Sequence, residues 1–139
     1  MKHQERIFWD TTKYPVEYPD KIRKIYFRVS LQSRKHFTIW VGDISKNFAS
    51  DIDWWVTTPL SRNPHMSDLF HSICTLRTLE ILSSQIKDVL VQVNSKSLFD
   101  VIKIWSDKNK LSINVDYVKK NRKIEGRFMI LKCIFDIFL

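Results

Sequence analysis

Asp88-Val-Leu-Val-Gln-Val-Asn-Ser-Lys-Ser97 is the stretch that decides the fold. Its first six residues are almost continuously apolar, which is typical of a central strand in a parallel sheet covered on both faces. The next four are polar and suit a turn that caps a helix, because Ser and Asn side chains accept hydrogen bonds from free backbone N–H groups. The stretch therefore predicts a buried strand that leads directly into a helix, the repeating step of α/β folds.

Downstream, the sequence predicts that helix and then a further strand. Apolar residues recur at i, i+3, i+4 and i+7, so they lie on one helix face: Leu98, Val101, Ile102 and Trp105. After a polar turn over Ser106–Lys110, three apolar residues alternate with polar ones: Ile113, Val115 and Tyr117. Alternation leaves one side of a strand solvated, so residues 113–117 are predicted to form an edge strand.

Upstream, the run Asp53-Trp-Trp-Val-Thr-Thr58 predicts the first strand, which Pro59 ends. A helix follows from Ser67 to about Ser84, and its apolar residues cover more than one stripe, which indicates burial on two sides. Together, residues from about Ile52 to Val118 predict a Rossmann-like, three-stranded parallel β-α-β-α-β unit. Right-handed crossovers place its strands in sequential order.

The flanking segments differ from this unit. Residues 1–50 are predicted to be a small β-rich segment, because Lys24–Leu31 and His36–Val41 are dense in β-forming residues and Gly42 follows. Residues 119–139 are basic and then apolar, and predict a helical segment that either packs on the domain or continues into a longer protein. Since three parallel strands are half of a doubly wound sheet, residues 51–118 are interpreted as a half-domain of a larger, two-domain protein.

The amino-acid composition limits the classes of partner that the chain is expected to bind. The chain has 139 residues, and its hydrophobic content of 44% is enough for a packed core. The net charge of +8 favours anionic partners such as phosphorylated small molecules, nucleic acid or anionic lipid. Nucleic acid is disfavoured, because several tryptophans fall at predicted core positions and no RNA- or DNA-binding signature is present. The two cysteines form no metal-ligand motif and are interpreted as reduced, buried thiols, and the N-terminus lacks the apolar region of a secretory signal, which together predict a cytoplasmic chain. No stretch is long and apolar enough to span a membrane.

Candidate binding residues follow from the predicted fold, because open parallel sheets bind ligands beyond the carboxyl ends of their strands. The loops after the first two predicted strands supply these candidates: Thr58, Ser61, Arg62, Asn63, Asn94 and Lys96. Both loops lead into helix N-termini, which favour anions. His65 is the candidate for proton transfer, whereas His71 is interpreted as a helix-surface or interdomain residue. The same polar composition is also expected of ordinary solvated loops.

No cofactor is evident. The chain has two glycines, Gly42 and Gly126, and contains neither GxGxxG nor GxxxxGK[ST]. Close backbone approach to a dinucleotide or a nucleoside triphosphate depends on such glycines. The histidines lack metal-binding spacing.

The stretch Asp53-Trp-Trp-Val-Thr-Thr-Pro-Leu-Ser-Arg-Asn-Pro-His-Met-Ser-Asp-Leu-Phe-His71 resembles the N-terminal part of bacterial surface-carbohydrate biosynthesis proteins, a glycosyltransferase-like family of capsule and O-antigen pathways. The resemblance extends loosely over residues 51–139. It implies two Rossmann-like domains that act at the cytoplasmic face of the membrane on nucleotide-activated or lipid-linked sugars. Four residues match the motif, without an assigned role: Ser61, Arg62, Asn63 and His71.

The leading hypothesis is therefore the N-terminal, Rossmann-like portion of a glycosyltransferase-like protein. Its strand C-terminal edge would bind an anionic sugar or lipid-phosphate group, and catalysis would need residues outside this chain. Residues 119–139 would contact an anionic membrane surface from the inner side. The alternatives are a non-catalytic protein-interaction module and, third, a basic nucleic-acid-binding domain.

Overall fold

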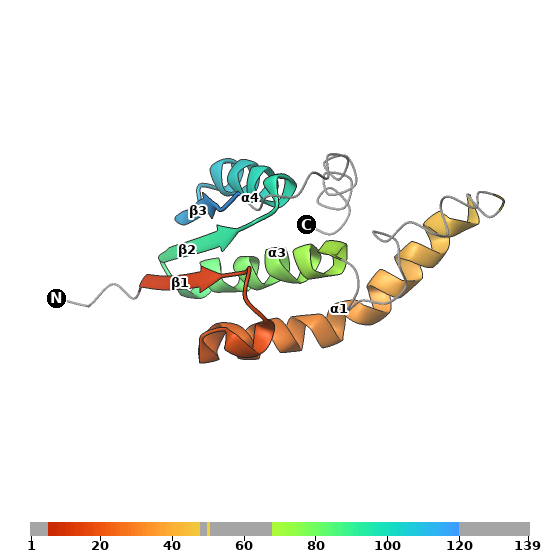
Figure 1. Ribbon diagram of the computed structural model, residues 1–139, viewed down its shortest axis with the longest axis horizontal. Coiled ribbons are helices and arrows are strands. Elements are labelled where there is room, and N and C mark those ends of the chain that lie inside the picture. The colour runs from red at the N-terminus through yellow and green to blue at the C-terminus, as the bar shows by residue number, and fades with distance from the viewer. Residues whose placement is uncertain (1–5, 48–49, 51–67, 120–139) are drawn as a thin grey trace.

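The computed structural model describes residues 6–47, 50 and 68–119, and these form an α/β unit around a three-stranded parallel sheet (Figure 1). The strands are β1 (Arg6–Asp10), β2 (Asp88–Val93) and β3 (Ile113–Tyr117). Their order in the sheet is β1-β2-β3, with Phe8, Leu90 and Asn114 side by side in register. The predicted parallel sheet, its sequential strand order, its central strand and its edge strand at residues 113–117 are confirmed.

The first strand of the sheet is not the predicted one. We predicted that residues 53–58 pair with β2, but β1 pairs with β2 along five positions from Arg6↔Asp88 to Asp10↔Gln92. Since β3 occupies the other side of β2, both hydrogen-bonding edges of the central strand are already filled. Residues 53–58 themselves lie outside the described residues. The β-α-β-α-β unit thus begins near the N-terminus rather than at Ile52.

Helix α1 (Asp20–Lys46) replaces the two strands predicted at residues 24–31 and 36–41, and that prediction is wrong. The first half of the helix buries a stripe with spacing i, i+3, i+4 and i+7: Ile22, Ile25, Tyr26 and Val29. Phe37, Val41 and Ser45 continue the burial at intervals of four. This period of 3.6 residues decides the structure, because β propensity is weak against the gain from burying one helix face. Pro19, which cannot extend a helix backwards, immediately precedes the first turn.

Two further helices follow the predictions closely. Helix α3 (Asp68–Gln85) is buried on more than one side, as predicted, because it packs against both α1 and the sheet (Figure 1). Helix α4 (Lys96–Asn109) buries Leu98, Val101, Ile102 and Trp105 and leaves its other face to solvent, also as predicted. A short 3-10 helix, η1 (Pro15–Glu17), joins β1 to α1.

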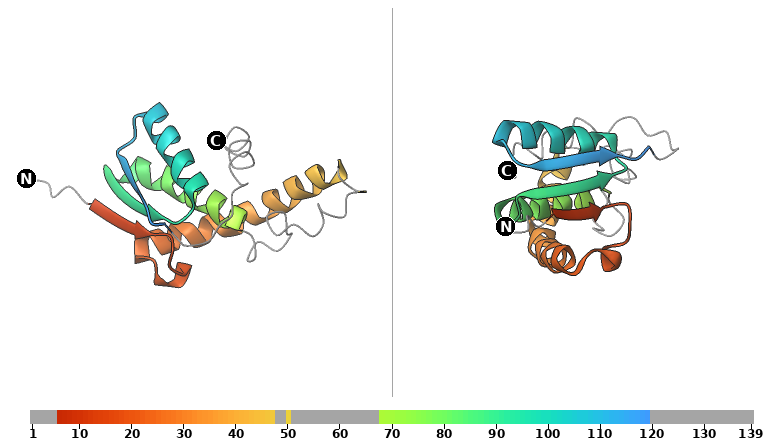
Figure 2. Two further views of the ribbon diagram at one scale, coloured as in Figure 1. Left: turned by 45° about the horizontal axis from the view of Figure 1, so that its top comes forward. Right: turned by 90° about the vertical axis from the view of Figure 1, so that its left-hand side faces the viewer.

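The helices lie on one side of the sheet (Figure 2). Along β2, Val89, Val91 and Val93 are fully buried toward the helices, whereas the intervening residues are partly exposed. The prediction that β2 is covered on both faces is therefore wrong for the part of the chain that the structure describes. On the uncovered face, Phe8 is 50% exposed.

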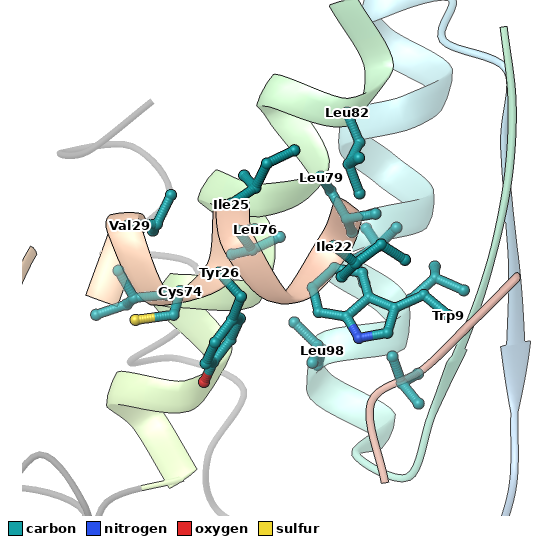
Figure 3. Packing of buried hydrophobic residues seen from close by; sticks show 14 of the residues in the cluster. Trp9, Ile22, Ile25, Tyr26, Val29, Cys74, Leu76, Leu79, Leu82 and Leu98 are labelled. Carbon is teal, nitrogen blue, oxygen red and sulfur yellow. The ribbon is translucent and has the colours of Figure 1, made fainter. Parts of the chain in front are cut away.

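A single apolar core fills the space between sheet and helices (Figure 3). Trp9 of β1 is fully buried beside Ile22 of α1 and Leu79 of α3. Burial of side chains of this size contributes about 1.5–3 kcal/mol each, which makes this the main source of stability. The core holds the C-terminal ends of the strands in fixed relative positions, and those ends carry the candidate site.

Candidate functional site

The carboxyl ends of all three strands meet at one edge of the sheet, because the strands are parallel. We call this the C-terminal edge and define it by the residues that follow β1 and β2: Thr11, Thr12, Lys13, Asn94, Ser95 and Lys96. Val118, which follows β3, donates its backbone N–H to the carbonyl of Val93 over 2.9 Å and closes the edge on the β3 side. Open parallel sheets bind their ligands at this position.

Two of the predicted binding residues, Asn94 and Lys96, lie at the C-terminal edge as expected for a loop after β2. The other predicted residues lie outside the described residues: Thr58, Ser61, Arg62, Asn63 and His65. The loop that leaves β1 for this edge is instead Thr11–Lys13, which sequence reasoning did not select. It was missed because a five-residue strand close to the N-terminus carries little pattern.

The loop after β1 is held by four hydrogen bonds. The backbone N–H and the hydroxyl of Thr11 both donate to the carbonyl oxygen of Gln92, at 3.0 and 2.8 Å. The backbone N–H and the hydroxyl of Thr12 both donate to Oδ1 of Asp10, at 2.9 and 2.6 Å. An aspartate that accepts from the residue two positions later forms a local turn, so the carboxylate of Asp10 is engaged in shaping the loop.

His71 lies in the first turn of α3 and faces inward. Its Nδ1 is 2.7 Å from the hydroxyl of Tyr26 on α1, and the two rings lie with their centroids 5.7 Å apart. Burial lowers the pKa of His71, although the backbone of Thr11 and the nearby carboxylate of Asp68 act in the opposite direction. The interpretation of His71 as a helix-surface residue is wrong, because its imidazole packs against Tyr26 of α1; the alternative, an interdomain residue, stays a prediction. A signal was available, since the first turn of a crossover helix always lies near the C-terminal edge.

Lys96 begins α4 on the opposite side of the edge. Its Nζ is 2.7 Å from Oδ1 of Asp100 and 4.6 Å from the centroid of the Phe99 ring. The Lys96 side chain is 62% exposed, and an ion pair at such a surface contributes at most about 1 kcal/mol. An anion can therefore compete for this ammonium group. Ser95 caps the helix, with its hydroxyl oxygen accepting from the backbone N–H of Leu98 over 3.3 Å.

An aromatic cluster supports the loop from inside. The rings of Trp9, Tyr18 and Tyr26 pack edge to face, with centroids 5.4 to 6.3 Å apart. Burial raises the pKa of Tyr18 to about 12 and raises that of Tyr26 further. The indole N–H of Trp9 favours the ionised phenol of Tyr18, but the two groups form no hydrogen bond of normal geometry and both are buried. Both tyrosines are therefore neutral.

Cys74 is fully buried next to this cluster (Figure 3). Burial raises the pKa of its thiol to about 12, against a smaller opposing effect of Arg34. A thiol of this kind is neither a nucleophile nor a metal ligand at neutral pH, because both roles need the thiolate. Cys74 is thus a core residue, as its apolar sequence context predicts.

Two further properties of the described residues bear on function. No three His, Cys, Asp or Glu side chains among them are grouped so that they could hold a metal ion. Within the same ranges, no helix combines the length and the apolar character needed to cross a bilayer. The polar groups at the C-terminal edge include hydroxyls and the ammonium groups of Lys13 and Lys96, together with the carboxylates of Asp10 and Asp100, which are bonded to Thr12 and Lys96.

Searches of family models, curated proteins and solved structures find no match to this chain.

Proposed function

We propose that this chain is the N-terminal, Rossmann-like portion of a glycosyltransferase-like protein of bacterial surface polysaccharide biosynthesis. In this proposal the C-terminal edge binds the phosphate of a nucleotide sugar or of a lipid-linked sugar. Transfer itself uses a second nucleotide-binding half, so the chain alone binds but does not catalyse. The short motif from Asp53 to His71 supports the family, and the parallel sheet supports the location of the site.

One observation carries the location. The N-termini of α3 and α4 both lie at the edge to which the strands deliver Thr11–Lys13 and Asn94–Lys96. Helix N-termini present free N–H groups and a partial positive charge of about half an elementary charge each, which favours a phosphate. Lys13 and Lys96 are both at this edge and add full positive charges. The positive charges of Lys13 and Lys96 and the positive ends of the helix dipoles suit a phosphorylated ligand.

The test is titration of the chain with nucleotide sugars and with polyprenyl phosphate in detergent, followed by NMR. Lys96→Ala is expected to weaken binding at least tenfold. Lys108→Ala is the matched control, because Lys108 is in the last turn of the same helix and its removal changes the net charge equally. Equal losses in the two variants would show a nonspecific charge effect. Absence of binding to both ligand classes would overturn the proposal.

Arg62→Ala belongs to the same experiment, because the predicted loop at residues 58–65 carries the motif of the resembling family. A loss of phosphate binding comparable to that of Lys96→Ala would place Arg62 in the same site. Unchanged binding in this variant would remove the loop from the proposed site while leaving the C-terminal edge in it.

The proposal includes peripheral attachment to the inner face of the membrane through residues 119–139. It is supported by the basic composition that begins at Lys119, which is exposed immediately after β3. Anionic headgroups attract such segments by about 1 kcal/mol per basic residue. Cosedimentation with vesicles containing phosphatidylglycerol, but not with pure phosphatidylcholine, is expected. Equal cosedimentation with both vesicle types would argue against it.

A second candidate, a non-catalytic protein-interaction module, is favoured by the face of the sheet that none of the described helices covers. There Phe8 is half exposed, and Leu90 is next to it in register. Two results together would support this candidate. The chain would bind neither phosphorylated ligand, and the Phe8→Glu variant would no longer bind a protein that the wild type binds. Salt-sensitive binding of arbitrary oligonucleotides would instead favour the nucleic-acid alternative.

A further inference from the structure

Helix α1 carries a block of positive charge on its outer side. Between positions 21 and 42 it has six basic residues and no acidic one: Lys21, Arg23, Lys24, Arg28, Arg34 and Lys35. Lys24, Arg28 and Lys35 are exposed, and their spacing of four and seven residues places them along one side of the helix. Among the described residues, none of these three forms an ion pair with a carboxylate. Their charges are therefore directed at solvent.

Two large apolar side chains lie among these cations. The Leu31 side chain is 67% exposed, and its position is one turn from both Arg28 and Lys35. Phe27, one turn before Leu31, is 43% exposed, and its ring lies beside that of Tyr26 with the centroids 6.4 Å apart. We call Lys24, Phe27, Arg28, Leu31 and Lys35 together the α1 face. Cations that flank exposed apolar side chains are typical of helices that lie at the surface of an anionic membrane.

The position of α1 in the fold leaves this face open. Helix α1 lies along one side of the molecule, with α3 and the sheet on its inner side (Figure 2). The stripe that begins with Ile22 and ends with Val29 points into the core, and Leu31 lies on the opposite side of the helix. From Lys24 to Lys35 the α1 face extends over about 17 Å, at a rise of about 1.5 Å per residue. It can therefore contact a flat surface along three turns.

Helix α4 provides a comparison within the same molecule. Its outer side also exposes an aliphatic side chain, since Ile104 is 59% exposed. There, however, acidic and basic residues are interspersed: Asp100, Lys103, Asp107 and Lys108. The two helices thus expose similar apolar groups in opposite electrostatic settings. Charge separates the α1 face from an ordinary solvated helix surface.

The apolar side chains distinguish between two anionic partners. The phosphates of a nucleic acid attract lysine and arginine as strongly as lipid headgroups do. A nucleic-acid backbone, however, offers no apolar environment for Leu31. A bilayer offers both, because anionic headgroups lie directly above the acyl chains. The combination of the α1 face therefore favours a lipid surface.

We propose that the α1 face binds anionic membrane, with Lys24, Arg28 and Lys35 at the headgroups and Phe27 and Leu31 inserted between them. This contact is separate from the attachment through residues 119–139, and it needs no phosphorylated sugar. It also gives the domain a defined orientation, because α1 is held rigidly against α3 by the apolar core. The sheet then lies on the far side of α3 from the lipid (Figure 2).

The first measurement is cosedimentation of the full chain with vesicles of phosphatidylcholine containing one third phosphatidylglycerol. A triple variant, Lys24→Gln with Arg28→Gln and Lys35→Gln, is expected to lower the partition coefficient on the order of 100-fold at low salt, since each cation contributes about fivefold. Circular dichroism should show an unchanged fold, because all three side chains are exposed.

The matched control removes three exposed cations elsewhere: Lys87→Gln, Lys103→Gln and Lys108→Gln. It changes the net charge equally but is expected to lower the partition coefficient less than about fivefold, because these charges are away from the lipid and are screened by salt. Equal losses in the two triple variants would overturn the proposal.

The second measurement tests insertion. Leu31→Gln is expected to lower vesicle binding several-fold, whereas Ile104→Gln on α4 should leave it unchanged. The same variants are titrated with a single-stranded oligonucleotide. Binding of the oligonucleotide that depends on Lys24, Arg28 and Lys35, together with vesicle binding that does not respond to Leu31→Gln, would favour a nucleic-acid surface and overturn the proposal.

A last variant separates the α1 face from the attachment included in the proposed function. It replaces the basic residues that follow β3 by glutamine: Lys119, Lys120, Arg122 and Lys123. Vesicle binding that falls in the α1 variant alone would support the α1 face and refute attachment through residues 119–139. Binding that falls only in the variant of residues 119–123 would refute the α1 face and leave that attachment standing. Losses in both would support two contacts with the same membrane.

Discussion

Nε of Arg6 on β1 lies 3.0 Å from Oδ2 of Asp88 on β2, and the two residues are also direct neighbours in the sheet register. The amide of Asn114 on β3 donates to the other oxygen of Asp88, over 3.2 Å. One carboxylate thus joins all three strands at the end opposite to the candidate site. The Arg6 side chain is 63% exposed, so this contact contributes at most about 1 kcal/mol, and the alignment of the strands depends mainly on their buried side chains.

The first prediction concerns the two faces of β1. Trp9→Ala is expected to lower the free energy of unfolding by about 3–5 kcal/mol, because it removes a fully buried indole from the core. Phe8→Ala, the adjacent residue on the uncovered face, is expected to cost less than about 1.5 kcal/mol, since Phe8 is half exposed. Urea unfolding followed by circular dichroism measures both. Similar losses would show that β1 does not present Trp9 to the core.

The second prediction tests helix α1 against the strands that its composition suggests. Lys24→Pro is expected to destabilise the chain by about 3 kcal/mol or more, because an exposed position inside a helix loses a backbone hydrogen bond and gains a steric clash. Asp20→Pro, at the first helical position, is expected to cost less than about 1 kcal/mol, since proline is tolerated there. Thermal unfolding of both variants is the measurement. Equal effects would be incompatible with a helix that begins at Asp20.

The third prediction concerns the start of α4. Ser95→Ala is expected to cost about 1 kcal/mol, because the backbone N–H of Leu98 loses the hydroxyl that accepts from it. Ser97→Ala is the control inside the helix, where alanine is at least as favourable as serine. The measurement is the urea midpoint at constant slope. A larger cost for Ser97→Ala than for Ser95→Ala would place the helix start elsewhere.

The fourth prediction concerns Cys74. With a pKa raised from 9.0 to about 12, the thiol contains about a thousandfold less thiolate at pH 8 than an unperturbed one. In a Cys133→Ser variant, native Cys74 should therefore react with a disulfide reagent at least a thousandfold more slowly than in urea, since burial also blocks access. A native rate within tenfold of the unfolded rate would mean that Cys74 is accessible.

The sequence predicted those elements whose own pattern was strong and failed where several signals competed. Helix α4 was predicted correctly because its four apolar residues have helical spacing, and strand β2 because its short apolar run is rich in valine and is followed by turn residues, although its burial on both faces was not borne out. Helix α1 was predicted as two strands because Ile, Tyr, Val and Trp favour strands by propensity. The helical spacing of Ile22, Ile25 and Tyr26 indicates a helix instead, and the two signals conflict. Tertiary burial decides between such signals, and propensity alone cannot.

The sequence predicted the position of the candidate site in the fold, but only some of the residues that form it. The rule that parallel sheets bind ligands at their C-terminal edge correctly selected the loop with Asn94 and Lys96. It could not select Thr11, because nothing in the sequence shows that the strand before Thr11, β1, pairs with β2. Pairing between segments that are far apart in the chain leaves no local pattern. The contact between Tyr26 and His71 is equally nonlocal, since it depends on how α1 and α3 pack.

The pairing of β1 with β2 also sets an order of assembly. On the ribosome, β1 is synthesised first but finds its neighbour only after α1, α3 and β2 have followed, whereas β2 and β3 are separated by α4 alone. Closing the longer loop is slower, because contacts between distant segments form late. We therefore expect β2, α4 and β3 to assemble as a nucleus, while Trp9 remains exposed to solvent and to chaperones until β1 docks as the last strand.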